Sequence, residues 1–330
     1  LGEYRNYTYS AMLTLSQPIY AGGSLNNSKK MAYRQSLIDM LSEENATDMV
    51  CYQADVAYWS LSSAIAYMSA AEEYKSIIKK QLDLTSDRFK DGLIGKTDLL
   101  MISTRSQEAE LQYISARENY LLSLQQFNIL CGKNPDTEMR YSIDKIDYIL
   151  NDQKIYTIDQ VFERRADYRA AAEAVMYQKA AKGVAMSKFN PIISAYVAGG
   201  WNTSSPYLGS KVALTPIVGM QLNIPIFNWN KKSNVSRQYD AYISTKEAGK
   251  GITEDNIKVE FQSALLKLKE SEKQVIAAKK NMEFANENLD LVTFSYNEGR
   301  GSMVDVITSQ LSWIQARNSL IQVSTANKVA

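Results

Sequence analysis

The sequence predicts a mainly α-helical protein with a smaller set of β-strands, and three observations lead to that fold class. Residues 24–91 contain neither glycine nor proline and are rich in good helix formers, which predicts one very long helix. Residues 4–17 and 211–224 alternate between polar and apolar side chains with the period of a strand. Many positions also match a second position 207 residues downstream, as Pro18 matches Pro225. We therefore expect long antiparallel helices joined to amphipathic strands, in a chain with an internal duplication.

The first long helix is expected to end at a glycine-rich turn. In "DGLIGKTD", Gly92 and Gly95 would cap the helix and turn the chain, and Thr97 or Asp98 would cap the next helix, which runs to Leu130. Side chains three and four positions apart along that second helix form a heptad seam, which predicts an antiparallel coiled coil. The seam consists of Leu99, Ile102, Ser106, Ala109, Tyr113, Ala116, Tyr120, Ser123, Phe127 and Leu130.

The second copy repeats this plan, with Gly299 in the place of Gly92. Its seam recurs at Val306, Ser309, Trp313, Ala316, Leu320, Val323 and Asn327. Gly249 and Gly251 predict a bend or fraying in its long helix, at about 1 kcal/mol each relative to alanine. Because the second copy is preceded by residues without a counterpart in the first, we interpret the sequence as a fragment. It would lack an N-terminal helix and strand and a short C-terminal tail.

The predicted strands each have one apolar and one polar face. Apolar side chains occupy odd positions in residues 4–17 and even positions in residues 211–224, as an odd offset requires. A third strand within residues 189–202 forms a hairpin with the latter. Such strands suit a transmembrane barrel with a wet interior and a soluble sandwich almost equally. Three strands cannot close a barrel, so copies from other chains in a symmetric ring are the simplest completion.

Composition excludes several classes of function. The chain has no histidine, which removes the commonest general base and metal ligand, so we expect neither an enzyme nor a metal site nor a cofactor. A net charge of +1 gives no reason to expect a nucleic-acid partner. Cys51 and Cys131 are expected to be small buried hydrophobic residues without a disulfide bond.

Four segments together resemble the outer membrane efflux proteins, the TolC-like outer membrane factors. "LSQPIYAGG" and "LNIPIFNWN" resemble the two strand-to-helix junctions of that family, "RRADYRAAAEAV" is similar to its R-P-D-L helix start, and "YNEGRGSMVDVITSQLSWIQARNSLI" is similar to its final helical hairpin. Ala166 and Tyr168 depart from the proline and leucine of the R-P-D-L pattern.

This resemblance implies a homotrimer in the outer membrane of a Gram-negative bacterium. Each chain would give four strands to a shared lipid-embedded β-barrel, and its helices would build a periplasmic α-helical tunnel. The strand segments would be residues 1–23 and 189–230, the tunnel residues 24–131, 165–188 and 231–330, and an equatorial connector residues 132–164. The family serves as the exit duct of efflux pumps or of type I secretion, docking to a periplasmic adaptor linked to an inner-membrane RND or ABC transporter. A soluble coiled-coil scaffold with a β head and no pore is the alternative.

The resemblance also assigns roles to the two helical turns. Adaptor contacts would be made at the turns, although the same residues serve equally to reverse the chain: Gly92, Leu93, Gly95, Thr97, Gly299, Gly301 and Ser302. Asp305, and more weakly Asp98, would form a gate near the pore constriction, or would only complement a helix dipole.

The strand-to-helix junctions and the strand aromatics are the remaining predicted sites. The junction residues are Pro18, Gly22, Gly23, Pro225 and Phe227, where proline is expected to end strand pairing. Trp229 and Asn230 replace the glycine pair in the second copy, so we expect the two junctions to turn differently. Four aromatic residues are either part of an interfacial belt or ordinary strand formers: Tyr7, Tyr9, Trp201 and Tyr207.

Overall fold

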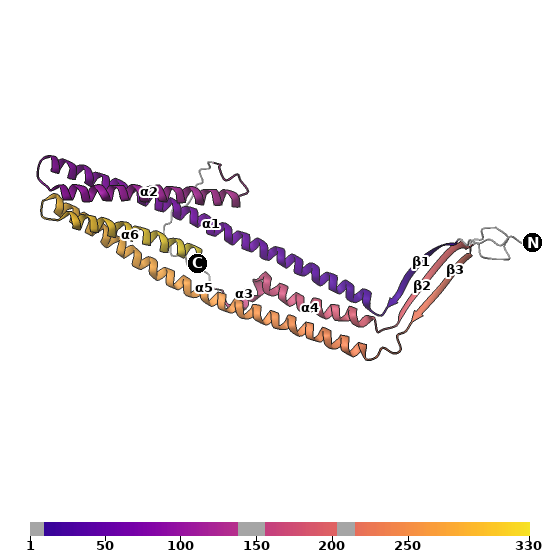
Figure 1. The fold of residues 1–330 in the computed structure, drawn as a ribbon. Coiled ribbons are helices and arrows are strands. Elements are labelled where there is room, and N and C mark those ends of the chain that lie inside the picture. The colour runs from indigo at the N-terminus through magenta and orange to yellow at the C-terminus, as the bar shows by residue number, and fades with distance from the viewer. Residues whose placement is uncertain (1–9, 138–155, 203–214) are drawn as a thin grey trace, which may run out of the picture. The chain divides into compact units, whose positions relative to one another are not determined.

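The computed structural model describes residues 10–137, 156–202 and 215–330 (Figure 1). Tyr7, Tyr9 and Tyr207 lie outside the described residues, as do the side chain of Trp201 and residues 138–155 of the expected connector. The chain divides into two compact units. Unit 1 comprises residues 1–45 and 157–257, and unit 2 comprises residues 46–156 and 258–330.

The described elements are long helices and three strands, which confirms the mainly α-helical fold class. In chain order they are β1 (Ser10–Ala21), α1 (Ser24–Lys90), α2 (Lys96–Leu130), α3 (Ile158–Arg164), α4 (Ala166–Ser187), β2 (Ile192–Asn202), β3 (Thr215–Asn223), α5 (Lys231–Asn297) and α6 (Met303–Val329). α1 and α5 each contribute to both units. Within the described residues, no helix has both the length and the apolar character needed to cross a bilayer.

The helix boundaries repeat at the spacing of the sequence matches. α1 and α5 both contain 67 residues, and they begin at Ser24 and Lys231 (231 − 24 = 207). α2 and α6 begin at Lys96 and Met303 (303 − 96 = 207). The expected fraying at Gly249 and Gly251 is wrong, because α5 runs through both without interruption. A glycine costs about 1 kcal/mol, which is too little to break a helix whose flanking turns are already formed.

In unit 1 the three strands form an antiparallel sheet in the order β1-β2-β3. Leu15 lies opposite Val197, and Val197 lies opposite Val218. The apolar side chains therefore share one face, as the alternation predicted. That face is open in the single chain, since Leu15 is 74% and Val218 79% exposed. Within the described residues β1 and β3 form the two edges of the sheet.

The two strand-to-helix junctions turn through the same backbone region. Gly22 and Gly23 have φ of 62° and 90°, and Trp229 and Asn230 have φ of 46° and 60°, so each junction has two successive residues with positive φ. The junctions still differ, as expected, because β1 runs to Ala21, whereas β3 ends at Asn223 and residues 224–228 precede the second turn. Pro225 follows the end of β3, as expected. Pro18 does not end pairing, because β1 continues to Ala21 after a register shift between Pro18 and Tyr20. Proline is tolerated there because it lies at the register shift, where the regular pairing is interrupted.

Within unit 1, α4 packs between the first part of α1 and the first part of α5. Arg34 pairs with Glu173 at 2.8 Å, and Lys182 pairs with Asp240 at 2.6 Å. The start of α4 is fixed by Asp167, which accepts two hydrogen bonds from the guanidinium of Arg165. Partial burial opposes ionisation of Asp167, but the hydrogen bonds and charge of Arg165 hold its pKa below the usual value.

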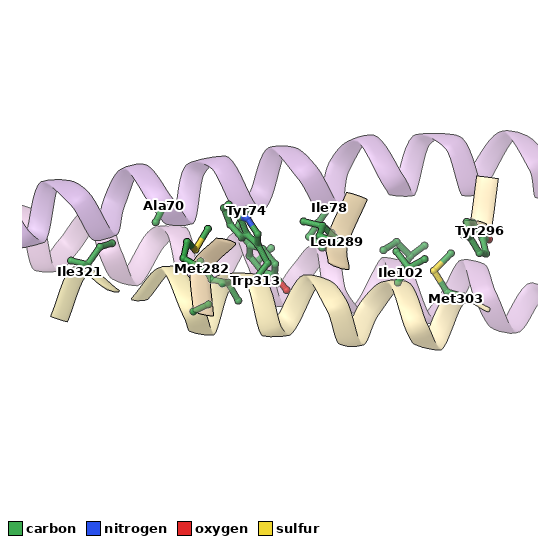
Figure 2. Close-up of a cluster of buried hydrophobic side chains, with 14 residues drawn as sticks. Ala70, Tyr74, Ile78, Ile102, Met282, Leu289, Tyr296, Met303, Trp313 and Ile321 are labelled. Atoms are coloured by element: carbon green, nitrogen blue, oxygen red, sulfur yellow. The ribbon is translucent and has the colours of Figure 1, made fainter. Parts of the chain in front are cut away.

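Unit 2 is organised around one apolar cluster drawn from α1, α2, α5 and α6 (Figure 2). Tyr74 and Trp313 stack near the middle of the cluster with ring centroids 6.5 Å apart. The indole Nε1 of Trp313 donates a hydrogen bond to Asn286 Oδ1 at 2.5 Å. Burial raises the pKa of Tyr74, so its hydroxyl stays neutral at physiological pH.

The heptad seams predicted for α2 and α6 face this interior. From Ile102 to Phe127 every seam residue of α2 is buried or half-buried, and the same holds for α6 from Val306 to Asn327. The two cysteines are free, as expected, but both are exposed, so the prediction of burial is wrong. Cys131 forms the C-cap of α2, beyond the packed part of the seam.

Candidate functional site

The candidate site consists of the two turns that connect the helix pairs of unit 2. Turn 1 is residues 91–95, between α1 and α2, and turn 2 is residues 298–302, between α5 and α6. The predicted site residues Gly92, Leu93, Gly95, Gly299, Gly301 and Ser302 lie in these turns, and Thr97, Asp98 and Asp305 lie in the first turn of the following helix.

Both long helices end in the same hydrogen-bonded cap. In turn 1 the amides of Gly92 and Leu93 donate to the carbonyls of Phe89 and Arg88, at 3.0 and 2.9 Å. In turn 2 the amides of Gly299 and Arg300 make the equivalent bonds, at 3.0 and 2.9 Å. Gly92 and Gly299 have φ of 72° and 75°. This is the Schellman arrangement, in which a glycine adopts the left-handed conformation without a steric penalty.

The helices that follow the turns begin differently. Ser302 is the N-cap of α6, where its hydroxyl accepts from the amide of Asp305 at 3.2 Å and donates to Asp305 Oδ2 at 2.9 Å. The N-cap of α2 is Gly95, which has no side chain to form such bonds. The expected capping of α2 by Thr97 or Asp98 is therefore wrong. Asp98 is half-buried in the first turn of α2, where its charge complements the helix dipole.

Arg88 connects the end of α1 with the end of α5. Its Nη1 and Nη2 donate to the carbonyls of Tyr296 and Asn297 at 3.1 and 2.7 Å, and its guanidinium lies 5.3 Å from the Tyr296 ring centroid. Carbonyls in the last turn of a helix lack intrahelical partners and carry partial negative charge. A cation on one hairpin thus satisfies the helix terminus of the other. Sequence reasoning missed this contact, and an arginine four residues before a capping glycine was the available signal.

The backbone of the turns is open to a partner. Leu93 is 71% exposed. A Cβ built at Gly92, Gly95 or Gly299 would meet nothing within 4 Å, whereas one at Gly301 would lie 3.0 Å from the backbone nitrogen of Tyr296. Close approach of another protein to peptide groups is therefore sterically allowed at three of these four glycines.

A groove along the helices of unit 2 lies away from the two turns. It has a volume of about 680 Å³ between α1, α2 and α6 and is lined mainly by uncharged side chains, including Ser63, Gln112 and Asn119. Tyr67 also lines the groove, and burial raises the pKa of its hydroxyl. In the described part of the chain, no three acidic or cysteine side chains gather in a way that could hold a metal ion.

Comparison with known proteins gives one curated relative and several solved structures. Nodulation protein T of Rhizobium leguminosarum bv. trifolii is 24% identical over 301 residues, which cover 86% of this chain. The chain spans 60% of the length of that relative.

Three solved structures that share the fold are described here, and each match covers 98% of this chain. The outer membrane protein VceC of Vibrio cholerae is 14% identical with a TM-score of 0.81, and 85% of its chain is covered. A membrane protein from Pseudomonas aeruginosa is 17% identical with a TM-score of 0.80, and 82% is covered. The open MtrE outer membrane channel of Neisseria gonorrhoeae is 16% identical with a TM-score of 0.77, and 78% is covered.

A family model supplies the assignment that these distant similarities cannot. The model described as "Outer membrane efflux protein" matches residues 2–133 and 157–330, so the match includes both turns, both junctions and every described helix. The resemblance carried by the junction and hairpin motifs is thereby confirmed. The chain belongs to the outer membrane efflux protein family.

Proposed function

We propose that this protein is the subunit of a trimeric, passive exit duct in the outer membrane, through which an efflux pump releases its substrates. The observation that carries the proposal is the open apolar face of the sheet. Leu13, Leu15, Val218, Met220 and Leu222 are each between 59% and 82% exposed in the single chain. Lipid acyl chains would cover these side chains and keep them out of water.

The sheet edges support assembly into a closed barrel. Within the described residues, β1 and β3 each pair on one side, and an unpaired edge cannot lie in lipid with its backbone groups unsatisfied. Copies of the same sheet around a symmetry axis would pair these edges with one another. The family resemblance adds a fourth strand per chain to this ring.

The helices offer a matching surface for neighbouring copies. Ile114 on α2 is the counterpart of Ile321 (321 − 114 = 207), and Phe284 on α5 is the counterpart of Ile77 (284 − 77 = 207). Ile321 belongs to the buried cluster and Ile77 packs against it, whereas Ile114 is 48% and Phe284 65% exposed. Within one chain, the two hairpins cover Ile77 and Ile321 where they pack against each other. A second copy that packed on this chain with the same geometry would cover Ile114 and Phe284.

Size and conductance measurements test the duct. After detergent extraction from a Gram-negative host the protein should be a trimer, and in a planar bilayer it should conduct ions. Recovery of a monomer from the soluble periplasm without detergent would support the alternative, a soluble coiled-coil scaffold with a β head and no pore.

Turns 1 and 2 are proposed to contact a periplasmic adaptor that connects the duct to an inner-membrane RND or ABC transporter. The open backbone at Gly92, Gly95 and Gly299 supports this role, and a mere reversal of the chain is the competing interpretation. Because Cys51 and Cys131 are exposed, both are first replaced by serine. Single cysteines at Leu93 and at its counterpart Arg300 should then crosslink to the adaptor in cells. If neither cysteine forms an adduct with the adaptor, the proposed contact is wrong.

Asp305 and Asp98 are proposed to form a gate of carboxylates around the pore. The hydrogen bonds between Asp305 and Ser302 make a purely local role the competing interpretation. Asp305→Asn separates the two, because an amide oxygen still accepts from Ser302 while the charge is lost. The gate predicts reduced cation selectivity and altered single-channel conductance for Asp305→Asn. Unchanged selectivity and conductance would leave only the helix-capping role.

A further inference from the structure

The two hairpins of unit 2, α1–α2 and α5–α6, carry grooves at equivalent positions (Figure 1). Groove 1, of about 680 Å³, is lined by α1, α2 and α6. Groove 2, of about 720 Å³, is lined by α5, the end of α6 and Tyr52 of α1. Four lining residues of groove 2 lie 207 positions after four of groove 1. They are Lys267, Glu270, Ser271 and Gln274, after Ser60, Ser63, Ala64 and Tyr67. The duplication thus produces the same wall twice, once neutral and once charged.

The two grooves differ in their third wall. In groove 1 this wall is α6, and the hydroxyl of Tyr67 donates to the carbonyl of Asn318 on α6 at 3.4 Å. The counterpart of that part of α6 is α2, with Leu111 in the place of Asn318 (318 − 111 = 207). Among the described residues α2 contributes nothing to groove 2, because it forms a wall of groove 1. An α2 that completes groove 2 would therefore belong to a second copy of the chain.

The register of groove 1 determines which residues would meet across groove 2. α1 and α6 run antiparallel, so one heptad beyond the contact of Tyr67 with α6 lie Ser60 and Thr325, and both line groove 1. Their counterparts are Lys267 on α5 and Glu118 on α2 (267 − 60 = 207, 325 − 118 = 207). A second copy packed in the same register would place an ammonium group opposite a carboxylate.

Another contact between α1 and α6 supports this register. The ammonium group of Lys328 lies 5.2 Å from the ring centroid of Trp59. The counterparts of these two residues are Leu121 and Leu266 (328 − 121 = 207, 266 − 59 = 207). In the single chain Leu121 is 37% and Leu266 68% exposed. The register that brings the charges together would therefore also cover two exposed leucines beside them.

A second pair of charges corresponds to two buried serines. Ser63 on α1 and Ser324 on α6 are 9% and 4% exposed, and they lie about one turn along their helices from the cation–π contact between α1 and α6. Their counterparts are Glu270 and Arg117 (270 − 63 = 207, 324 − 117 = 207), which are exposed in the single chain. Charged side chains are rarely buried without a partner, so burial at equivalent positions requires opposite signs. Glu270 and Arg117 meet this requirement.

We propose that two ion pairs join α5 of one copy to α2 of a second copy. The pairs are Lys267 with Glu118, and Glu270 with Arg117. This inference rests on the proposed assembly of copies into a ring, and it names the side chains that choose the neighbour. A hairpin α1–α2 packed on its own kind would place Glu118 and Arg117 against neutral serines. Two α5–α6 hairpins would leave the charges of α5 in the same position. Only unlike hairpins pair every charge, so the two kinds alternate around the ring.

Exchange of the charges tests the first pair. Lys267→Glu and Glu118→Lys each place like charges at every contact between copies, so each should speed subunit exchange between trimers about tenfold or more. The variant with both changes should return close to the wild-type rate, because the pair is restored with its signs reversed. Native mass spectrometry of mixed isotope-labelled and unlabelled trimers in detergent measures the rate. A double variant that exchanges as fast as the faster single variant, or faster, would overturn the pair.

A charge on the same helix but outside the contact is the control. Lys280→Glu makes the same change of charge on α5, and its counterpart Glu73 stays exposed although α6 packs on α1. Lys280→Glu should exchange subunits at the wild-type rate. An acceleration equal to that of Lys267→Glu would show that the trimer responds to total charge, and it would overturn the specific pairing.

Crosslinking separates the ion pair from the trimer. The two native cysteines are first replaced by serine. Lys267→Cys combined with Glu118→Cys should then give covalent dimers and trimers with a short bismaleimide. Ser60→Cys combined with Thr325→Cys is the matched pair within one chain, and it should be joined without forming dimers.

The outcomes of crosslinking distinguish three failures. If the protein is a trimer but Lys267→Cys with Glu118→Cys gives no covalent dimer, the pair is overturned and the duct stands. If the protein is a monomer in native mass spectrometry, the proposed assembly fails together with the pair. Covalent dimers from Lys267→Cys alone or from Glu118→Cys alone would show that like hairpins are neighbours, which overturns the alternation.

Discussion

The two helical hairpins, α1–α2 and α5–α6, have matching boundaries but different surroundings. α6 buries nine side chains along 27 residues, whereas α2 buries three along 35 residues. α6 is covered on two faces because the cluster of unit 2 places it against the other helices. The open face of α2 includes Leu111, Ile114 and Leu122, which are 67%, 48% and 55% exposed. The second hairpin is thus completed by the first within one chain, and the first leaves its equivalent face available to another copy.

The largest expected effect comes from the centre of the cluster. Trp313→Ala should reduce the free energy of unfolding by about 3–5 kcal/mol, because it removes a buried ring stacked on Tyr74 and leaves a cavity. The counterpart of Trp313 is Ser106, which is only half-buried. Ser106→Ala should change the free energy by less than about 0.5 kcal/mol in the same denaturant titration in detergent. Equal losses would mean that the hairpins are packed alike.

The second prediction uses one pair of isoleucines. Ile321→Ala should cost about 2–5 kcal/mol of unfolding free energy, because Ile321 is 6% exposed within its own chain. Ile114→Ala should leave the unfolding of the chain nearly unchanged and instead favour dissociation of the proposed trimer, which native mass spectrometry in detergent measures. If Ile114→Ala leaves the trimer population unchanged while Ile321→Ala unfolds the chain, another copy does not cover the face of α2.

A smaller effect is expected where the two hairpins are joined by Arg88. Arg88→Ala should lower the free energy of local opening at turn 2 by about 1 kcal/mol, because the carbonyls of Tyr296 and Asn297 each lose the hydrogen bond from Arg88, while Tyr296 keeps the one from the Gly299 amide. Hydrogen exchange of the amides of Gly299 and Arg300 reports this opening. Lys96→Ala, which removes an exposed cation beside turn 1, is the control and should not affect those amides. Unchanged exchange in Arg88→Ala would show that turn 2 holds itself in place.

The smallest effect concerns the caps, and it should have opposite signs in the two hairpins. Gly95 has φ −81° and ψ 157°, which suit any residue, and space around its Cβ position. Gly95→Ser should therefore stabilise α2, and Ser302→Ala should destabilise α6, each by about 1 kcal/mol. Thermal unfolding followed by circular dichroism measures both. A destabilising Gly95→Ser would mean that turn 1 requires glycine for a reason other than its backbone conformation.

Most of the fold was predictable because it depends on patterns with one physical cause. The absence of glycine and proline set the length of α1, and Gly92 marked its end, since a left-handed cap nearly demands glycine. The alternation of polar and apolar side chains predicted which strand positions face the same side. Two expectations about single residues were wrong for a common reason. The glycines within α5 and Pro18 within β1 are weak local signals, and the surrounding hydrogen bonds outweigh them.

The candidate site was less predictable because it depends on contacts between the two helical hairpins. Arg88 binds carbonyls more than 200 positions away, and no periodicity points to that partner. Cys51 and Cys131 were expected to be buried from residue type alone, but exposure depends on which helix face they occupy. The left-handed conformation of Trp229 was likewise hidden, because tryptophan is the residue from which that backbone would least be expected.

The equal lengths of α1 and α5 restrict how such a chain can change in evolution. Deleting one residue from either helix would shorten it by about 1.5 Å and rotate everything beyond by about 100°, which would move its seam away from its partner. Both helices contain 67 residues, so a length change in one would leave turns 1 and 2 at different levels. We therefore expect insertions and deletions among related chains to occur in both helices together and in steps of about seven residues, which restore the seam.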